Sequence, residues 1–189
     1  MTRHQTCSEG RSVKEYIVEP NLEFSTVLGF LLMAGTYVLI HYVFNTGFRF
    51  LKSPLELLKA GLLILAIVPL HEIIHAVVIL MRRGRPRVGV KIKYKVLILA
   101  VYVASFQPLR RNSAIFVLLT PLLALNFVFL FLLVILSPFR TEIAVLIAAN
   151  TGASVWDIIS SFQLLKFPSS SLILDEGARL RVFVNEKFA

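Results

Sequence analysis

Charged residues are scarce in this sequence. Only 16% of the 189 residues are Asp, Glu, Lys or Arg, whereas 57% are hydrophobic and the mean hydropathy is +0.77. A water-soluble domain has a more polar composition, so these values indicate an integral membrane protein. The chain also lacks internal repeats and low-complexity tracts, and we expect a single domain over residues 1–189.

Cysteine is nearly absent as well. Cys7 is the only one, which excludes an intrachain disulfide and a zinc cluster built on thiolates. Any metal must therefore be held by His and carboxylate side chains. The first apolar run also lacks a small-residue cleavage site near its end, so we expect a retained membrane anchor rather than a signal peptide.

Long hydrophobic runs are what the sequence has in abundance. A helix needs about 20 apolar residues to cross a bilayer. Four windows meet this requirement: Phe24–Phe44, Ala60–Met81, Ser113–Leu136 and Glu142–Leu165. We therefore predict a mainly α-helical, polytopic membrane protein with about four transmembrane helices, of which the last is the most polar.

Basic residues are distributed unevenly between the loops. The N-terminal segment, the 82–112 loop and the C-terminal segment carry sixteen Lys and Arg, whereas the two opposite loops carry three. The positive-inside rule then predicts a multi-pass protein of the cell membrane with both termini cytosolic, so that residues 1–23 and 167–189 are cytosolic tails. The net charge of +9 is expected to face anionic lipid headgroups. No nucleic-acid-binding motif accompanies it, and we expect no nucleic-acid partner.

The basic loop 82–112 has the pattern of a small β-rich insert between the second and third helices. Apolar and cationic positions alternate with a period of two, which predicts a strand: Val88, Val90, Ile92 and Tyr94 against Gly89, Lys91, Lys93 and Lys95. The run Val96–Ala104 predicts a second strand. Two interpretations stay open: a sheet whose lysines contact lipid phosphates, or a strand edge that accepts an extended peptide. A short C-terminal β-hairpin is predicted to turn at Asp175-Glu176-Gly177.

The stretch PLHEIIHAVVIL, residues 69–80, places ionisable groups inside the second apolar window. His71 and His75 are four residues apart, so on a helix they project from one face and can share a metal ion. Glu72 is about 100° of rotation from His71, close enough to contact a metal-bound water. This is the H-E-x-x-H pattern of zinc peptidases, with two ligands and a general base.

The membrane setting favours a functional role for these groups. An ionisable side chain near the bilayer centre costs about 2.5–3.5 kcal/mol on insertion scales, so something must compensate for Glu72 and the two imidazoles. A metal site would do so. The alternative is a polar contact in which the histidines hydrogen-bond to neighbouring helices.

Asp157 is the candidate third ligand. His71 and His75 are about 10–17 Å from the cytosolic end of their helix near Arg82, and Asp157 is about 14 Å from Lys166, at 1.5 Å per residue. The three groups are therefore level in the membrane. Asp157 could instead pair with Lys59 or line a water cavity, and the reserve ligands are Asp175 and Glu176, which a turn in a soluble tail also explains.

These residues carry a family resemblance. The motif HEIIHA in an apolar helix, the basic β insert, the proline-containing third span, NTGASVWDI, KFP and the final hairpin resemble the "putative zincin peptidase" family of bacteria and archaea. That family is similar to the site-2 proteases, which are intramembrane zinc metalloproteases. The resemblance implies Zn²⁺ held by His71, His75 and Asp157 near the cytosolic side, with Glu72 as catalytic base. It also implies that Asn150 orients the substrate backbone.

The resulting hypothesis is an intramembrane zinc metallopeptidase that hydrolyses membrane-associated proteins or peptides. Zinc would lower the pKa of a water to about 7, and Glu72 would act as general base. The stretch SVWDII stands where site-2 proteases have an Asp-Gly pair, a difference that bears on substrate handling. Two other classes stay open: a non-catalytic adaptor with a structural zinc, and a small transporter that uses the same groups as a metal or proton relay.

Overall fold

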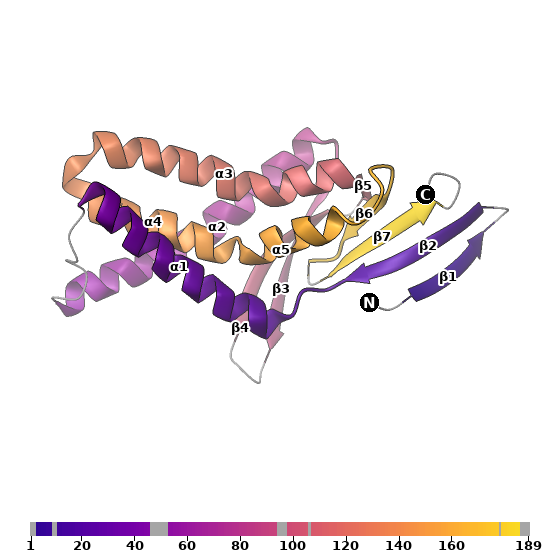
Figure 1. Cartoon of the computed structure of the whole chain (residues 1–189), viewed down its shortest axis with the longest axis horizontal. Coiled ribbons are helices and arrows are strands. Elements are labelled where there is room, and N and C mark those ends of the chain that lie inside the picture. The colour runs from indigo at the N-terminus through magenta and orange to yellow at the C-terminus, as the bar shows by residue number, and fades with distance from the viewer. Residues whose placement is uncertain are drawn as a thin grey trace. The chain divides into compact units, whose positions relative to one another are not determined.

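Figure 1 shows the computed structural model of the chain. The structure describes residues 3–8, 11–45, 53–93, 98–105, 107–177 and 179–185. The chain divides into two compact units: Met1–Asn21, Glu72–Thr120 and Trp156–Ala189 form one, and Leu22–His71 and Pro121–Val155 form the other.

Three helices are long and apolar enough to cross a membrane. They are α1 (Leu22–Phe44), α2 (Pro54–Met81) and α3 (Arg111–Ile135). Each presents large apolar side chains at its surface, such as Leu31, Leu65 and Phe127, which are 63%, 68% and 75% exposed. Exposed apolar surface of this extent is typical of helices that face lipid. The first three predicted windows are therefore confirmed as single long helices.

The window predicted as a fourth single span is two helices. The short 3₁₀ helix η3 (Ser137–Phe139) leads into α4 (Arg140–Ala153), and α5 (Val155–Leu164) follows after a bend of 41° at Ser154. The Ser154 hydroxyl donates to the Asn150 carbonyl over 2.7 Å, a contact that bends helices. Among the described residues the candidate spans thus number three, or four if the bent pair is one span.

A five-stranded antiparallel sheet belongs to the first unit (Figure 1). Its strands, in spatial order, are β1 (Arg3–Ser8), β2 (Arg11–Val18), β7 (Leu180–Asn185), β6 (Leu172–Asp175) and β5 (Leu109–Arg110). The pair β6–β7 confirms the predicted C-terminal hairpin. Strands β1 and β2 were not foreseen, because the N-terminal segment was expected to be a tail. In β2, Lys14 shares a face with Tyr16 and Val18 and breaks the apolar alternation that would have predicted a strand.

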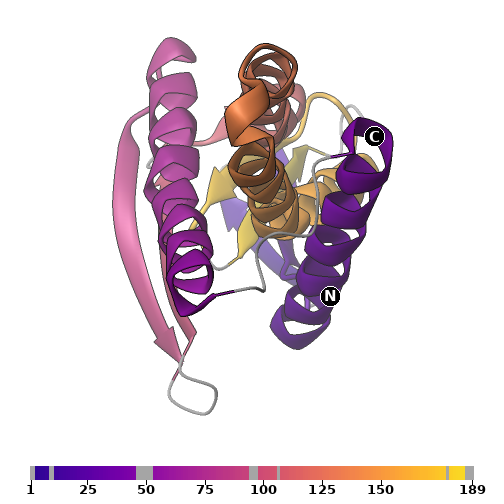
Figure 2. The same ribbon diagram turned by 90° about the vertical axis from the view of Figure 1, so that its left-hand side faces the viewer.

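The predicted strands of the basic insert are also present. Strands β3 (Pro86–Lys93) and β4 (Ile98–Ser105) form a separate antiparallel pair, which packs with the C-terminal half of α2 (Figure 2). Val103 of β4 is buried against Val78 and Ile79 of α2 and Val117 of α3. The predicted strand positions 94–97 lie outside the described residues, and so do the side chains of Val90–Lys93.

The core of the first unit holds α5 in place. The buried apolar side chains of this core come from the sheet, from the start of α3 and from α5, and they include Leu118, Leu164, Ile173, Leu180 and Val182. Burying side chains of this size stabilises their positions by about 1.5–3 kcal/mol each. The core therefore anchors the C-terminal part of α5, the helix whose first turn carries Asp157.

In the second unit, α1 and α4 approach each other closely at two glycines. A Cβ added to Gly29 would lie 2.9 Å from the Gly152 carbonyl oxygen, and one added to Gly152 would lie 2.8 Å from the Gly29 carbonyl oxygen. Close contacts between small residues are how helices associate in a bilayer, where lipid offers no hydrophobic driving force. The pair Gly29–Gly152 therefore sets the separation of these two helices.

This contact makes a testable prediction. Gly29→Ala should destabilise the protein by about 1–3 kcal/mol, because the added methyl group forces α1 and α4 apart. Gly35→Ala is the matched control on the same helix: nothing lies within 4 Å of its added Cβ, so it should be neutral or stabilising by about 0.5–1 kcal/mol. Thermal unfolding in detergent micelles measures both. Equal effects of the two substitutions would contradict the close approach of α1 and α4 at Gly29.

Candidate metal centre

Helix α2 places two histidines on one buried face. His71 and His75 are one helical turn apart, and they are only 4% and 5% exposed. Residues at i and i+4 lie on the same face of a helix, so the backbone of α2 alone brings the two imidazoles together. The spacing predicted from the sequence is therefore confirmed.

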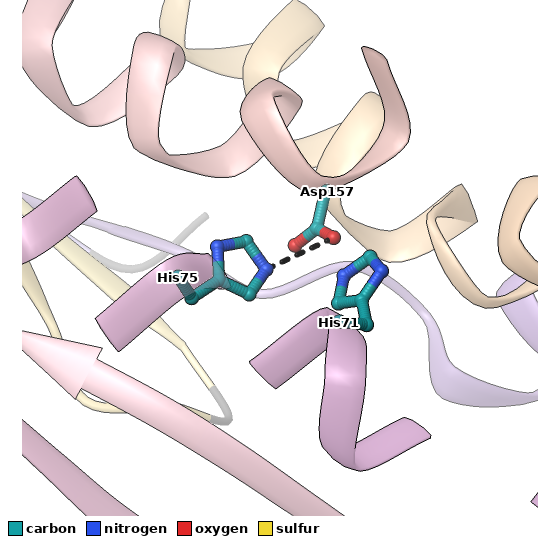
Figure 3. Close-up of side chains that lie close together, drawn as sticks. All are labelled: His71, His75 and Asp157. Atoms are coloured by element: carbon teal, nitrogen blue, oxygen red, sulfur yellow. Dashed lines mark ion pairs between the residues drawn. The ribbon is translucent and has the colours of Figure 1, made fainter. Parts of the chain in front are cut away.

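Asp157 joins the two histidines from the first turn of α5. It is 7% exposed, and its Oδ2 lies 3.5 Å from Nε2 of His75. One ligand atom from each of His71, His75 and Asp157 lies within 4.8 Å of the others, and the three side chains point toward one another (Figure 3). The structure thus brings together the three residues that the sequence predicted as ligands.

The donor set fits a zinc ion. Imidazole nitrogen and carboxylate oxygen are both zinc ligands at about 2.0–2.2 Å, and two ligand atoms of a tetrahedral site are therefore about 3.3 Å apart. The 3.5 Å between His75 and Asp157 is close to that separation. Three protein ligands leave one coordination position open, which is the pattern of catalytic rather than structural zinc sites.

Each imidazole is held by a hydrogen bond at its Nδ1 nitrogen. Nδ1 of His75 lies 3.0 Å from the carbonyl oxygen of Val117 in α3. Nδ1 of His71 lies 3.0 Å from the side-chain oxygen of Asn150 in α4. Contacts of this kind orient metal-ligating histidines. Neither partner was identified from the sequence, although hydrogen bonds from the histidines to neighbouring helices were one expectation.

Glu72 is separate from this group of three and contacts β4. The backbone N–H of Val103 donates to its Oε2 over 2.6 Å. This bond fixes the orientation of the Glu72 carboxyl group. The same bond shows that the outer edge of β4 runs past Glu72, because the N–H of Val103 is not used in pairing with β3.

Asn150 is buried and hydrogen-bonded to other residues of the protein. It is 0% exposed, its oxygen faces His71, and its amide nitrogen donates to Asn126 over 2.9 Å and to the carbonyls of Pro121 and Leu122 over 3.3 and 3.4 Å. These contacts favour a role in orienting His71. Its predicted role in binding the substrate backbone stays a prediction.

The reserve ligands lie elsewhere. Asp175 accepts the backbone N–H of Gly177 over 2.7 Å inside the β6–β7 turn, where Gly177 has a φ of 79°. Glu176 pairs with Arg179 and Arg181. Among the described residues, only His71, His75 and Asp157 form a group that could hold a metal ion.

A cleft of about 730 Å³ opens beside β4. Its volume is within the usual range for ligand sites. Residues of β3, β4 and the β6–β7 turn line it: Arg87, Val88, Gly89, Tyr102, Ala104, Ser105, Leu174, Asp175, Glu176 and Arg179. Val103 lies between two of these residues in β4, so one strand forms both a wall of the cleft and the contact with Glu72.

Comparisons with known proteins identify a family for this chain. The model of a family described as "Putative zincin peptidase" matches residues 64–172, which is more than half of the chain and includes the three clustered residues. A protein of Pyrococcus woesei named "Uncharacterized 24.7 kDa protein in gap 5'region" is 31% identical over 157 residues, covering 82% of this chain and 67% of its own length. No solved structure matches the chain.

The cleft carboxyl Asp175 gives a prediction for pH dependence. Burial raises its pKa to about 7, although the Gly177 N–H lowers it and the carboxylate of Asp157 raises it further. The folded protein therefore binds a proton there that the unfolded chain has already released, so stability should fall as the pH rises from about 4 to above 7. In metal-free protein, Asp175→Asn should reduce the loss of melting temperature between pH 5.5 and 8.5.

Glu176→Gln is the matched control for this measurement. Burial raises the Glu176 pKa, but the bonds from Arg179 and Arg181 outweigh it and leave the pKa lowered. Glu176 is then ionised throughout the range from pH 5.5 to 8.5 in both the folded and the unfolded chain. Its substitution should shift the melting curve without changing the slope against pH. A slope identical in the parent and in Asp175→Asn would contradict the raised pKa.

Proposed function

The chain belongs to this family of zincin peptidases, and on that premise we propose that it is a membrane-embedded zinc metalloendopeptidase similar to the site-2 proteases. Its substrates are membrane-associated proteins or peptides. The observation that carries the proposal is the convergence of His71, His75 and Asp157 within 4.8 Å. Glu72, which follows His71 directly, supplies the carboxylate that such chemistry requires.

His71, His75 and Asp157 would hold the zinc ion. When bound, zinc supplies Lewis-acid chemistry: it lowers the pKa of a coordinated water and polarises the carbonyl of the scissile peptide. The protein's part is to orient both rings so that Nε2, rather than Nδ1, is directed at the metal. The bonds from Nδ1 to Val117 and Asn150 do this, since each places the ring proton on the nitrogen that points away from the group of three.

Glu72 is the general base of the proposed reaction. It takes a proton from the water that attacks the scissile carbonyl and returns it to the leaving amine. A base must be held within hydrogen-bond reach of the proton that it removes, and the Val103 N–H restricts the carboxylate to one orientation. Glu72 is partly exposed, unlike the two histidines. It can therefore meet a substrate that approaches along β4.

The substrate is proposed to bind as an extended chain along the outer edge of β4. A peptide in a helix has its carbonyls engaged in internal bonds, so a transmembrane substrate must unwind before it can be cleaved. Within the described residues, β4 pairs with β3 alone in its sheet, so an added strand could pair with its second edge on either side of Val103, whose N–H is bonded to Glu72. The cleft lined by Tyr102, Ala104 and Ser105 would take the side chains of that strand.

The predicted placement in the membrane is retained as part of the proposal. The excess of Lys and Arg in the 82–112 loop and in the terminal segments favours the cytosolic side for all three. The exposed arginines Arg82, Arg83 and Arg85 between α2 and β3, with Arg87 in β3, would contact anionic headgroups there. Arg82 also stacks on the ring of Phe116, 4.4 Å from its centroid, which holds its guanidinium near the end of α2.

Two substitutions separate metal binding from catalysis. Glu72→Gln should retain about one zinc per chain but lose cleavage by a factor of about 10²–10⁴, because it removes only the base. Asp157→Ala should lose both zinc and cleavage, because it removes a ligand. Zinc is measured by elemental analysis of the purified protein. Cleavage is measured with a fluorogenic single-span peptide in proteoliposomes.

Glu142→Gln serves as the control, since it neutralises a carboxyl group in the first turn of α4 that takes no part in the site. It should keep the zinc and the parental rate. Parental cleavage by Glu72→Gln would refute the base assignment. Zinc bound by a parent that cleaves no membrane peptide would instead favour the non-catalytic adaptor.

A further inference from the structure

Helix α3 contains a proline one turn after the carbonyl that holds His75. Pro121 is fully buried in the interior of this helix. In a regular helix the N–H of residue 121 would donate to the carbonyl of residue 117. Proline has no N–H, and its ring pushes that carbonyl away from the helix axis. Val117 is therefore the residue whose carbonyl loses its helical donor.

The released carbonyl is the one that contacts the metal centre. Its oxygen lies 3.0 Å from Nδ1 of His75, across 42 residues of sequence. A carbonyl oxygen can only accept a hydrogen bond, so Nδ1 must carry the ring proton. In the neutral ring Nε2 then has the lone pair, and Nε2 is the atom that lies 3.5 Å from Oδ2 of Asp157. The missing donor of Pro121 thus determines which nitrogen of His75 is available to a metal.

The other histidine is oriented by a chain of side chains with a fixed direction. The Thr151 hydroxyl donates to the carbonyl of Ile147 over 2.9 Å, so it accepts from the Asn126 amide over 3.0 Å. The Asn126 oxygen then faces the Asn150 amide nitrogen, and the Asn150 oxygen faces Nδ1 of His71. His71 therefore also carries a proton on Nδ1. The orientation of its ring depends on Asn150 and not on Pro121.

We propose that Pro121 is a positioning residue of the metal centre, which acts by releasing the Val117 carbonyl to bind and orient His75. This inference rests on the proposed zinc site. A proline in a membrane helix could serve only to bend it, since prolines are common there. The two roles differ in one respect: only the positioning role links Pro121 to the affinity for zinc and to the ring of His75 in particular.

Pro121→Ala tests the proposal. The restored N–H should compete for the Val117 carbonyl and draw it back toward the helix axis. We expect zinc affinity, measured by competition with a chromophoric chelator, to fall by a factor of about 10–100, as for other outer partners of metal ligands. The metal-free protein should melt at the parental temperature or higher, because alanine suits a helix interior better than proline. Pro138→Ala, an exposed proline in η3, should leave zinc affinity unchanged.

The histidine Nδ1–H signals can be measured by nuclear magnetic resonance of the zinc-loaded protein with ¹⁵N-labelled histidine. If Pro121 served only to bend α3, its substitution would not change the signal of His75 selectively. Pro121→Ala should shift or broaden the Nδ1–H signal of His75 and leave that of His71 in place. Asn150→Ala should do the reverse. Every amino acid other than proline restores the N–H at position 121, so Pro121→Gly should reproduce the effect of Pro121→Ala on the His75 signal.

Two outcomes overturn the proposal in different ways. Parental zinc affinity in Pro121→Ala together with an unmoved His75 signal would reject the positioning role and leave the zinc site intact. Failure of the parent itself to bind zinc would reject the proposed function, and the positioning role with it.

Discussion

Two imidazoles buried in an apolar helix are the constraint on which the arrangement around them depends. Each ring has two nitrogens, and a buried polar atom without a partner costs about 1–3 kcal/mol. One nitrogen of His75 faces Asp157, so the other needs a partner from a neighbouring helix. The structure supplies a backbone carbonyl for His75 and an amide oxygen for His71. Two features that look unfavourable in isolation, the buried proline of α3 and the buried amide of Asn150 in α4, are explained by this need for partners.

The break in the last apolar window has a comparable explanation. Residues 142–165 do not form one straight helix, because the chain bends at Ser154. Asp157 therefore falls in the first turn of a second helix, α5. That helix is anchored through Leu164 to a core that includes Val18 of β2 and Val182 of β7. A ligand in the last apolar window is therefore held by strands at both ends of the chain. A rigid support of this kind is what a catalytic metal ligand requires.

Much of the site was predictable because its parts obey local rules. His71 and His75 share a face through helical geometry, and Asp157 was selected by counting residues from the ends of two helices. The outer partners were not predictable. The Val117 carbonyl and the Val103 N–H are backbone groups, which every residue has, so the sequence contains no specific sign of them. Asn150 was noticed, but its contact with His71 depends on how α2 and α4 pack across 79 residues of sequence.

The sequence by itself determined the apolar lengths of three helices, the pairing of two histidines and the chemical kinds of donor that any metal could use. These properties depend on neighbours within a few residues. The regular geometry of a helix sets the relative positions of such neighbours directly. The tertiary structure alone decided that the last window is bent, that the N-terminal segment adds two strands, and which groups orient the imidazoles. Those outcomes depend on packing between segments far apart in the chain, where many arrangements have similar local energies and only the assembled contacts select one.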